Sequence, residues 1–284
     1  MAHGMRLDHP IFNTPLKPRI EQTEIATPKN YLNWPEGHDC PPKIPGWKVH
    51  EGEFPKVDVG LVADPYGFED SPDAEWISSG VNSKGPRSVA LGRHGNYFMW
   101  GFWGDPSMMT DSARQVFINT IHYMKKFTGQ RPLITKQGQS REWSLVYAGY
   151  VRELGGKKDT AEFLNNLFEE RIKNEIGLDA DKLEAFFKAK LEYLHPVSPS
   201  FDVDPDLEQL NLSNRKLEFF DALVERLADD PEDPVSKRLL DRYAKGLTTP
   251  AELDVWLGSH RDRLFFSDVG GYRWFLKPAP APAR

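Results

Sequence analysis

The chain has 284 residues, which is enough for about two domains with hydrophobic cores of their own. Hydrophobic residues make up 39% and charged residues 27%, as in a globular protein, and the formal net charge is −6. No basic run could follow a phosphate backbone, so we expect no nucleic-acid partner. The single cysteine, Cys40, excludes an internal disulfide and every site that needs two cysteine ligands.

The sequence shows no signal for membrane insertion or secretion. No stretch approaches the roughly 18 consecutive apolar residues of a spanning helix, and residues 1–10 lack the apolar region of a signal peptide. We therefore expect no membrane span and a cytoplasmic location, unless an upstream segment is missing.

Residues 1–56 are dense in proline, which has no backbone donor, and we expect an extended, irregular segment without central strands. Residues 57–62 then alternate as in a strand. Residues 88–91 and 97–102 are rich in β-favouring types and predict a hairpin around the turn-prone stretch 92–96. Thr110 is a candidate N-cap for a helix that reaches Phe127 and packs on this sheet.

The remaining sequence predicts a series of short amphipathic helices. Apolar spacing over residues 143–154 predicts the first, which ends at Gly155 and Gly156. Capping boxes, glycine stops and apolar stripes predict the others over residues 159–176, 181–194, 217–227, 235–243 and 249–256. Residues 264–266 and 272–276 flank a Gly-Gly turn and predict a β-hairpin.

These elements predict an α/β fold, in which a partial open sheet with a packed helix is followed by a mostly α-helical C-terminal domain ending in a β-hairpin. The expected divisions are the extended segment 1–56, an α/β module 57–137, a helical domain 138–260, the hairpin 261–277 and a disordered tail 278–284.

The acidic loop Asp64–Glu75 contains enough carboxylates for a hard cation such as calcium. Its spacing does not follow an EF-hand loop, so we expect solvated turns and no metal, with Asp70 and Asp73 as weak ligand candidates. We expect no cofactor, because Gly-x-Gly-x-x-Gly and Walker loops are absent from the sequence. The Gly-x-Ser-x-Gly elbow of an exposed nucleophile is absent as well.

His94 lies beside Arg93 in the turn-prone stretch. An imidazole that titrates near neutral pH could act there as a general base, Arg93 would favour a bound anion, and Asp64 is a further catalytic candidate. The alternative is a polar turn residue without a catalytic role.

Three tryptophans are candidates for binding a sugar ring. Trp76, Trp100 and Trp103 could form a platform on which the C–H face of a sugar stacks. Strand alternation would instead place Trp100 on the same face as Phe98 and Phe102. This pattern favours a role for Trp100 in the hydrophobic core.

Three pieces of sequence follow one another in a characteristic order. They are Asp8-His9-Pro10-Ile11, the stretch from Val89 to Phe102, and the helix from Thr110 to Phe127. This order resembles the C-terminal half of the ThuA-like family, a branch of the class I glutamine amidotransferase-like superfamily that is associated with trehalose use and carbohydrate metabolism. The resemblance covers about residues 1–128 and implies an α/β fold with a carbohydrate-related role.

Two departures from that family bear on activity. The opening strands, with the elbow where the superfamily keeps its nucleophile, have no counterpart, and Gly101-Phe102 replaces the Gly-His pair of the family. We therefore expect a non-catalytic or degenerate module that acts in binding or assembly, with a protein partner, a missing upstream segment or a carbohydrate. The alternative is a carbohydrate-processing or hydrolytic enzyme that uses the His94 turn and the acidic loop.

Overall fold

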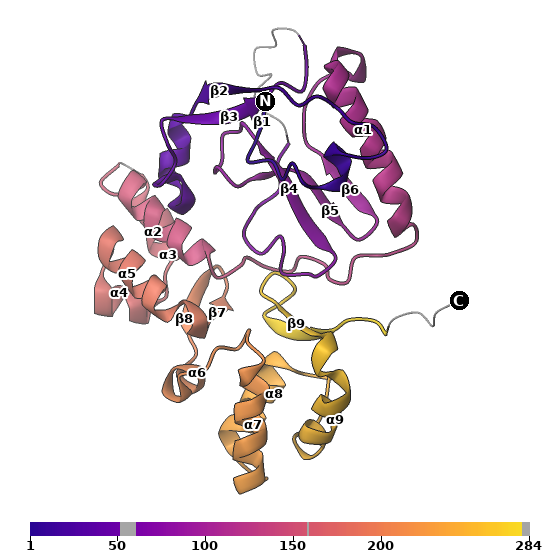
Figure 1. Cartoon of the computed structure of the whole chain (residues 1–284). Coiled ribbons are helices and arrows are strands. Elements are labelled where there is room, and N and C mark those ends of the chain that lie inside the picture. Colours follow the sequence, from indigo (N-terminus) through magenta and orange to yellow (C-terminus); the bar gives the residue numbers. More distant parts are fainter. Residues whose placement is uncertain (52–60, 158, 280–284) are drawn as a thin grey trace. The chain divides into compact units, whose positions relative to one another are not determined.

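The structure is a computed structural model that describes residues 1–51, 61–157 and 159–279 (Figure 1). It divides into two compact units, Met1–Leu133 and Ile134–Arg284. The predicted fold class is confirmed, since a sheet with a packed helix comes first and a mostly helical region ending in a β-hairpin follows.

The first unit is built on a curled sheet of six strands (Figure 1). In spatial order the strands are β2 (Gln22–Ala26), β3 (Lys43–Trp47), β1 (Ala2–His3), β4 (Ala74–Gly80), β5 (Val89–His94) and β6 (Tyr97–Trp100). Every pair of neighbours is antiparallel. The sheet thus differs from the mostly parallel sheets of doubly wound α/β folds.

Residues 1–51, the described part of the proline-rich segment 1–56, are not irregular as the prolines predict, because they supply β1, β2 and β3. β1 is a central strand that pairs with both β3 and β4. β3 tolerates Pro45 because β1 pairs only with Gly46 and Trp47, so no donor is needed from Pro45 on that side. Pro10 begins the short 3₁₀ helix η1 (Pro10–Phe12). A backbone N–H at the first position of a helix has no acceptor within the helix, so proline is tolerated there.

The predicted hairpin around residues 92–96 is confirmed, with a shorter turn than expected. Residues 92–94 belong to β5, and only Gly95 and Asn96 connect it to β6. Gly95 has a φ of +57°, which suits a glycine in the first central position of a two-residue hairpin turn. The strand predicted over residues 57–62 falls mostly outside the described residues.

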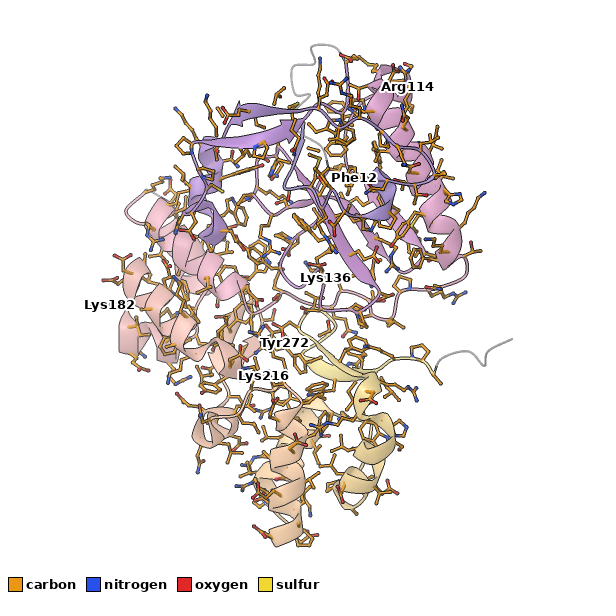
Figure 2. The ribbon with its side chains drawn as sticks, viewed as in Figure 1. Phe12, Arg114, Lys136, Lys182, Lys216 and Tyr272 are labelled. Carbon is orange, nitrogen blue, oxygen red and sulfur yellow. The ribbon has the colours of Figure 1, made fainter. Side chains whose placement is uncertain are left out.

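The predicted helix after Thr110 is α1 (Asp111–Met124), extended by the 3₁₀ helix η5 (Lys125–Phe127). The Thr110 hydroxyl accepts a hydrogen bond from the Ala113 N–H at 3.2 Å, which confirms the predicted cap. The apolar side of α1 packs into the core of the sheet. Figure 2 shows Phe12 inside this unit and Arg114 on the outer side of α1.

The second unit consists mainly of short helices, as the sequence predicts. They are α2 (Trp143–Leu154), α3 (Ala161–Asn166), α4 (Glu170–Ile176), α5 (Ala180–Lys190), α6 (Pro205–Leu210), α7 (Glu218–Asp229), α8 (Pro234–Tyr243) and α9 (Leu253–His260). One hydrophobic cluster lies among α2 to α5, and another lies among α7 to α9. The predicted C-terminal hairpin is confirmed as β9 (Leu264–Ser267) paired with β10 (Arg273–Leu276).

Two predicted helices are shorter in the structure. The helix expected over residues 159–176 is split into α3 and α4 after Asn165 and Asn166, which have low helix propensity. The Asn165 carbonyl, freed by the break, accepts a hydrogen bond from Lys173 Nζ at 3.1 Å. The helix expected over residues 181–194 is α5 followed by the 3₁₀ helix η6 (Leu191–Tyr193). Its last residue, Leu194, already belongs to β7 (Leu194–Val197), which pairs with β8 (Ser200–Val203).

The predicted tail 278–284 lies mostly outside the described residues, which end at residue 279. Among the helices within the described part of the chain, none is long and apolar enough to cross a membrane.

Candidate functional site

Arg93 and Glu75, both in the region singled out by the sequence, form an ion pair in the first unit. β4 and β5 place the two residues directly opposite each other. Arg93 Nε lies 2.9 Å from Glu75 Oε2, and Arg93 Nη2 lies 3.0 Å from Oε1, which is a bidentate arrangement. The Arg93 side chain is 5% exposed and stacks on Phe127, so it has no free face for a bound anion.

His9 and Tyr123 complete this cluster around the Glu75 carboxylate. The Tyr123 hydroxyl donates to Oε2 at 2.8 Å, and His9 Nε2 lies 3.5 Å from the same atom. Burial alone would raise the pKa of this carboxylate, but hydrogen bonds from His9, Arg93 and Tyr123 lower it to about 2. Burial and the carboxylate together raise the pKa of Tyr123 to about 12. Near neutral pH the Glu75 carboxylate is therefore held charged and the Tyr123 hydroxyl is held neutral.

His94 lies on the opposite face of β5 from Arg93, because successive strand residues point to opposite faces. Its Nε2 lies 3.6 Å from Asp73 Oδ1. Asp73 also accepts the Leu133 N–H at 3.0 Å and the Ser71 hydroxyl. The structure therefore joins His94 to one carboxylate of the acidic loop and separates it from Arg93.

The other carboxylates of the acidic loop have local partners. Asp64 Oδ1 accepts the Tyr66 N–H at 3.0 Å, and Glu69 Oε1 accepts the Trp76 N–H at 3.2 Å. Within the described residues, no group of three His, Cys, Asp or Glu side chains is placed to hold a metal ion, so no such group includes Asp70 or Asp73.

The three tryptophans do not form one platform. Gly92 of β5 pairs with Trp76 on one side and with Met99 on the other, so Trp76 and Met99 share a face. Trp100 follows Met99 and points to the opposite face, where it packs in the core against α1. Trp103 lies after β6 and is 68% exposed.

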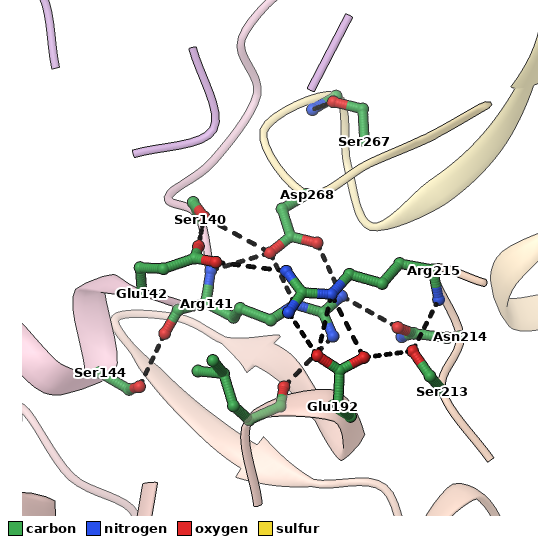
Figure 3. A network of polar contacts seen from close by, with 12 residues as sticks. Ser140, Arg141, Glu142, Ser144, Glu192, Ser213, Asn214, Arg215, Ser267 and Asp268 are labelled. Atoms are coloured by element: carbon green, nitrogen blue, oxygen red, sulfur yellow. Dashed lines mark hydrogen bonds and ion pairs between the residues drawn. The ribbon is translucent and has the colours of Figure 1, made fainter. Parts of the chain in front are cut away.

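The second unit contains a buried charged pair that the sequence analysis did not identify (Figure 3). Arg141 is fully buried, and its Nε and Nη2 atoms lie 2.7 Å from the two carboxylate oxygens of Asp268. The Arg141 backbone N–H donates to the same carboxylate at 3.0 Å, and Nη2 also donates to Asn214 Oδ1 at 2.9 Å. Burial alone would lower the pKa of Arg141, but the charge and hydrogen bonds of Asp268 raise it. Arg141 is therefore cationic and fully paired.

A second ionic group lies beside this pair (Figure 3). Arg215 contacts Glu192 and also lies 3.2 Å from Glu142 Oε1. Burial alone would raise the pKa of Glu192, but the hydrogen bonds from Arg215 and Ser213 lower it to about 2. Together the two groups connect the start of α2 with the residues that follow α5 and α6, so they fix the positions of segments distant in the sequence.

A cavity of about 450 Å³ lies next to Asp268. It is formed by the segment that leads into α2, by α2 itself, and by the β7–β8 and β9–β10 turns. Its polar lining is contributed by Gln137, Gln139, Tyr147, Ser198, Ser200, Asp268 and Tyr272. The volume is within the range of small-molecule sites.

The β9–β10 turn holds part of the cavity wall in an uncommon backbone conformation. Tyr272 has a φ of +52°, a left-handed value that a bulky residue adopts only when its surroundings impose it. The Gly271 and Tyr272 N–H groups both donate to the Asp268 carbonyl at 3.1 Å. Because Arg141 fixes the Asp268 side chain, the charged pair also fixes this wall of the cavity.

The sequence offered little to reveal this site. Arg141 and Asp268 are 127 residues apart, and neither belongs to a motif. The Gly270-Gly271 turn was the one local signal, but it predicted only a hairpin. Comparison of the chain with protein-family models, curated proteins and solved structures finds no match.

Proposed function

We propose that the chain is a binding protein and that the cavity of its second unit holds a neutral, polyhydroxylated ligand of the size of a mono- or disaccharide. The observation that carries this proposal is the lining of the cavity, which combines amide and hydroxyl groups with two tyrosines beside a buried charged pair.

The lining supports a sugar because its groups suit vicinal hydroxyls. The amides of Gln137 and Gln139 each donate and accept hydrogen bonds, and tyrosine offers an apolar ring together with a hydroxyl. Asp268 is the one charged residue among the described residues that line the cavity, and Arg141 neutralises it. A neutral ligand is therefore favoured over an ionic one.

Binding is favoured over catalysis because the strongest charged groups are already paired. Glu75 in the first unit and Asp268 in the second each accept several hydrogen bonds from buried partners. A general base must be free to take a proton from a substrate. The ThuA-like resemblance covers about residues 1–128 and therefore does not bear on this cavity, and membership of that family remains a prediction.

Titration calorimetry of the full chain against a panel of neutral monosaccharides and disaccharides, trehalose included, tests the proposal. We expect at least one sugar to bind. Gln137→Ala and Gln139→Ala should each weaken binding by about three- to tenfold, since each removes a hydrogen-bonding group from an exposed side chain. Gln209→Ala, an exposed position on α6, is the matched control. Binding by no sugar, or equal binding by all variants, would contradict the proposal.

A hydrolytic enzyme is the second candidate, and the 3.6 Å separation of His94 Nε2 and Asp73 Oδ1 favours it. An Asp–His pair can orient an imidazole for general-base catalysis. If this role is correct, the chain should hydrolyse chromogenic glycosides and His94→Gln should remove that activity without changing sugar binding. Absence of turnover by the wild-type chain would leave only the binding role.

A further inference from the structure

A groove runs between α7 and α9 in the second unit, apart from the proposed sugar cavity. It consists of two hollows of about 580 and 510 Å³ that share Val224 and Asp254 in their walls. Apolar side chains from both helices, including Val224, Leu227, Leu253 and Leu257, line it. The hollows are therefore adjacent. Leu227, Leu253 and Leu257 are almost fully buried, and Val224, Ala228 and Ala251 are among the accessible apolar residues of the lining.

The rim of the groove is acidic. Its described lining includes the carboxylates of Asp221, Glu225, Glu232, Asp254 and Asp262, against the cations Lys237 and Arg261. Arg261 is engaged by Asp221 at 2.6 Å, and Lys237 is engaged by Glu232. Among the described residues, no ion pair is formed by the remaining three carboxylates, which are exposed. The rim thus carries an uncompensated negative charge.

We infer that this groove is a docking site for a basic amphipathic helix of a partner protein. The backbone groups of α7 and α9 are already hydrogen-bonded within the helices, so an added strand would find few donors or acceptors along them. The side-chain ridges of a third helix fit between two helices, and its apolar stripe would cover the accessible apolar residues Val224, Ala228 and Ala251. Lysine or arginine residues beside that stripe would meet the acidic rim, which sets the charge of the partner.

The groove has the length of a short helix. Its lining follows α7 from Asp221 to Ala228, a distance of about 10 Å at the helical rise of roughly 1.5 Å per residue. Such a span accommodates about two helical turns, with anchors at positions i, i+3, i+4 and i+7.

Fluorescence anisotropy of the full chain with a labelled, end-capped peptide tests this inference. The probe has leucines at those anchor positions and lysines beside them. Two comparison peptides carry either glutamate in place of lysine or the same composition in scrambled order. We expect only the lysine amphipathic peptide to bind, and its affinity should fall as salt is raised, because the rim charges are exposed.

Substitutions in the chain locate the binding site. Ala228→Arg places a long cation over the groove at an exposed, helix-compatible position and should abolish binding. The double variant Glu225→Gln/Asp254→Asn should weaken binding by about three- to tenfold. The control Glu153→Gln/Glu162→Gln removes two exposed charges from α2 and α3 and should leave affinity unchanged.

Three results would overturn the inference: no binding of the lysine peptide, equal binding of the scrambled peptide, or equal loss in the groove and control variants. Circular dichroism confirms that each variant is folded before it is titrated. The sugar titration addresses a different surface, so either proposal can fail while the other holds.

Discussion

Glu75 keeps its charge in the folded chain at pH values where an unpaired glutamate takes up a proton. Its folded pKa of about 2 lies below the reference value of 4.5 because His9, Arg93 and Tyr123 bond to the ionised form. A carboxylate with a lowered pKa stabilises the folded state at pH values above its reference pKa. This stabilisation is lost as the pH falls toward the pKa of the folded state.

The unfolding free energy should therefore decrease between about pH 5 and pH 2 by about 3 kcal/mol through this residue alone. Urea unfolding at a series of pH values measures the effect. Glu75→Gln should be less stable than wild type at pH 6, and the difference should shrink as the pH is lowered. A constant difference across the range would show that Glu75 is not held in its charged form.

The buried pair of Arg141 and Asp268 leads to a second prediction at this scale. Asp268→Asn leaves a buried guanidinium without its counter-charge and should destabilise the chain by about 3–5 kcal/mol. The double variant Arg141→Met/Asp268→Leu removes both charges and should recover most of that loss. Asp241→Asn, at an exposed ion pair on α8, is the control and should change stability by less than about 1 kcal/mol. Equal losses in all three would contradict the assignment.

The hairpin of β5 and β6 shows why Gly95 correctly indicated a turn. Gly95 has a positive φ, and a Cβ on it would lie 2.7 Å from Pro132 N. Gly129 also has a positive φ, but a Cβ there would meet nothing within 4 Å. Both glycines therefore have a positive φ, but only at Gly95 would an added Cβ clash with a neighbouring residue.

Gly129→Ala should therefore destabilise the first unit by about 1 kcal/mol, and Gly95→Ala should cost at least about twice as much. Thermal and urea unfolding measure both variants. Equal losses of stability in the two variants would show that the chain around Pro132 moves aside for the added Cβ at no cost in free energy.

The helices and hairpins that were predicted correctly are those with local signals. Thr110 caps α1 through its own hydroxyl, and the turn of β5–β6 needs only Gly95. β1 was missed because two residues carry no periodicity, and their strand exists only through pairing with β3 and β4. The helix predicted over residues 181–194 overlaps β7 only at Leu194, and the pairing of β7 with β8 had no local signal.

At the scale of the whole molecule, the candidate sites were less predictable than the fold. Arg93 and the acidic loop were recognised, but their pairing depends on the register of β4 and β5, which sets Glu75 opposite Arg93. His94 and Arg93 are joint candidates only in the alternative interpretation of the chain as an enzyme, and strand alternation separates the two side chains. The cavity in the second unit joins segments from residue 137 to residue 272, and no short motif encodes such a set.

The proposed binding of a sugar in this cavity is tested by two-dimensional ¹H–¹⁵N spectra of the full chain, recorded while the sugar that binds most tightly is added. We expect progressive shifts of the Gln137 and Gln139 side-chain amides and of the Gly271 and Tyr272 backbone amides, saturating together. Shifts confined to other residues, or no shifts with any sugar of the panel, would contradict it.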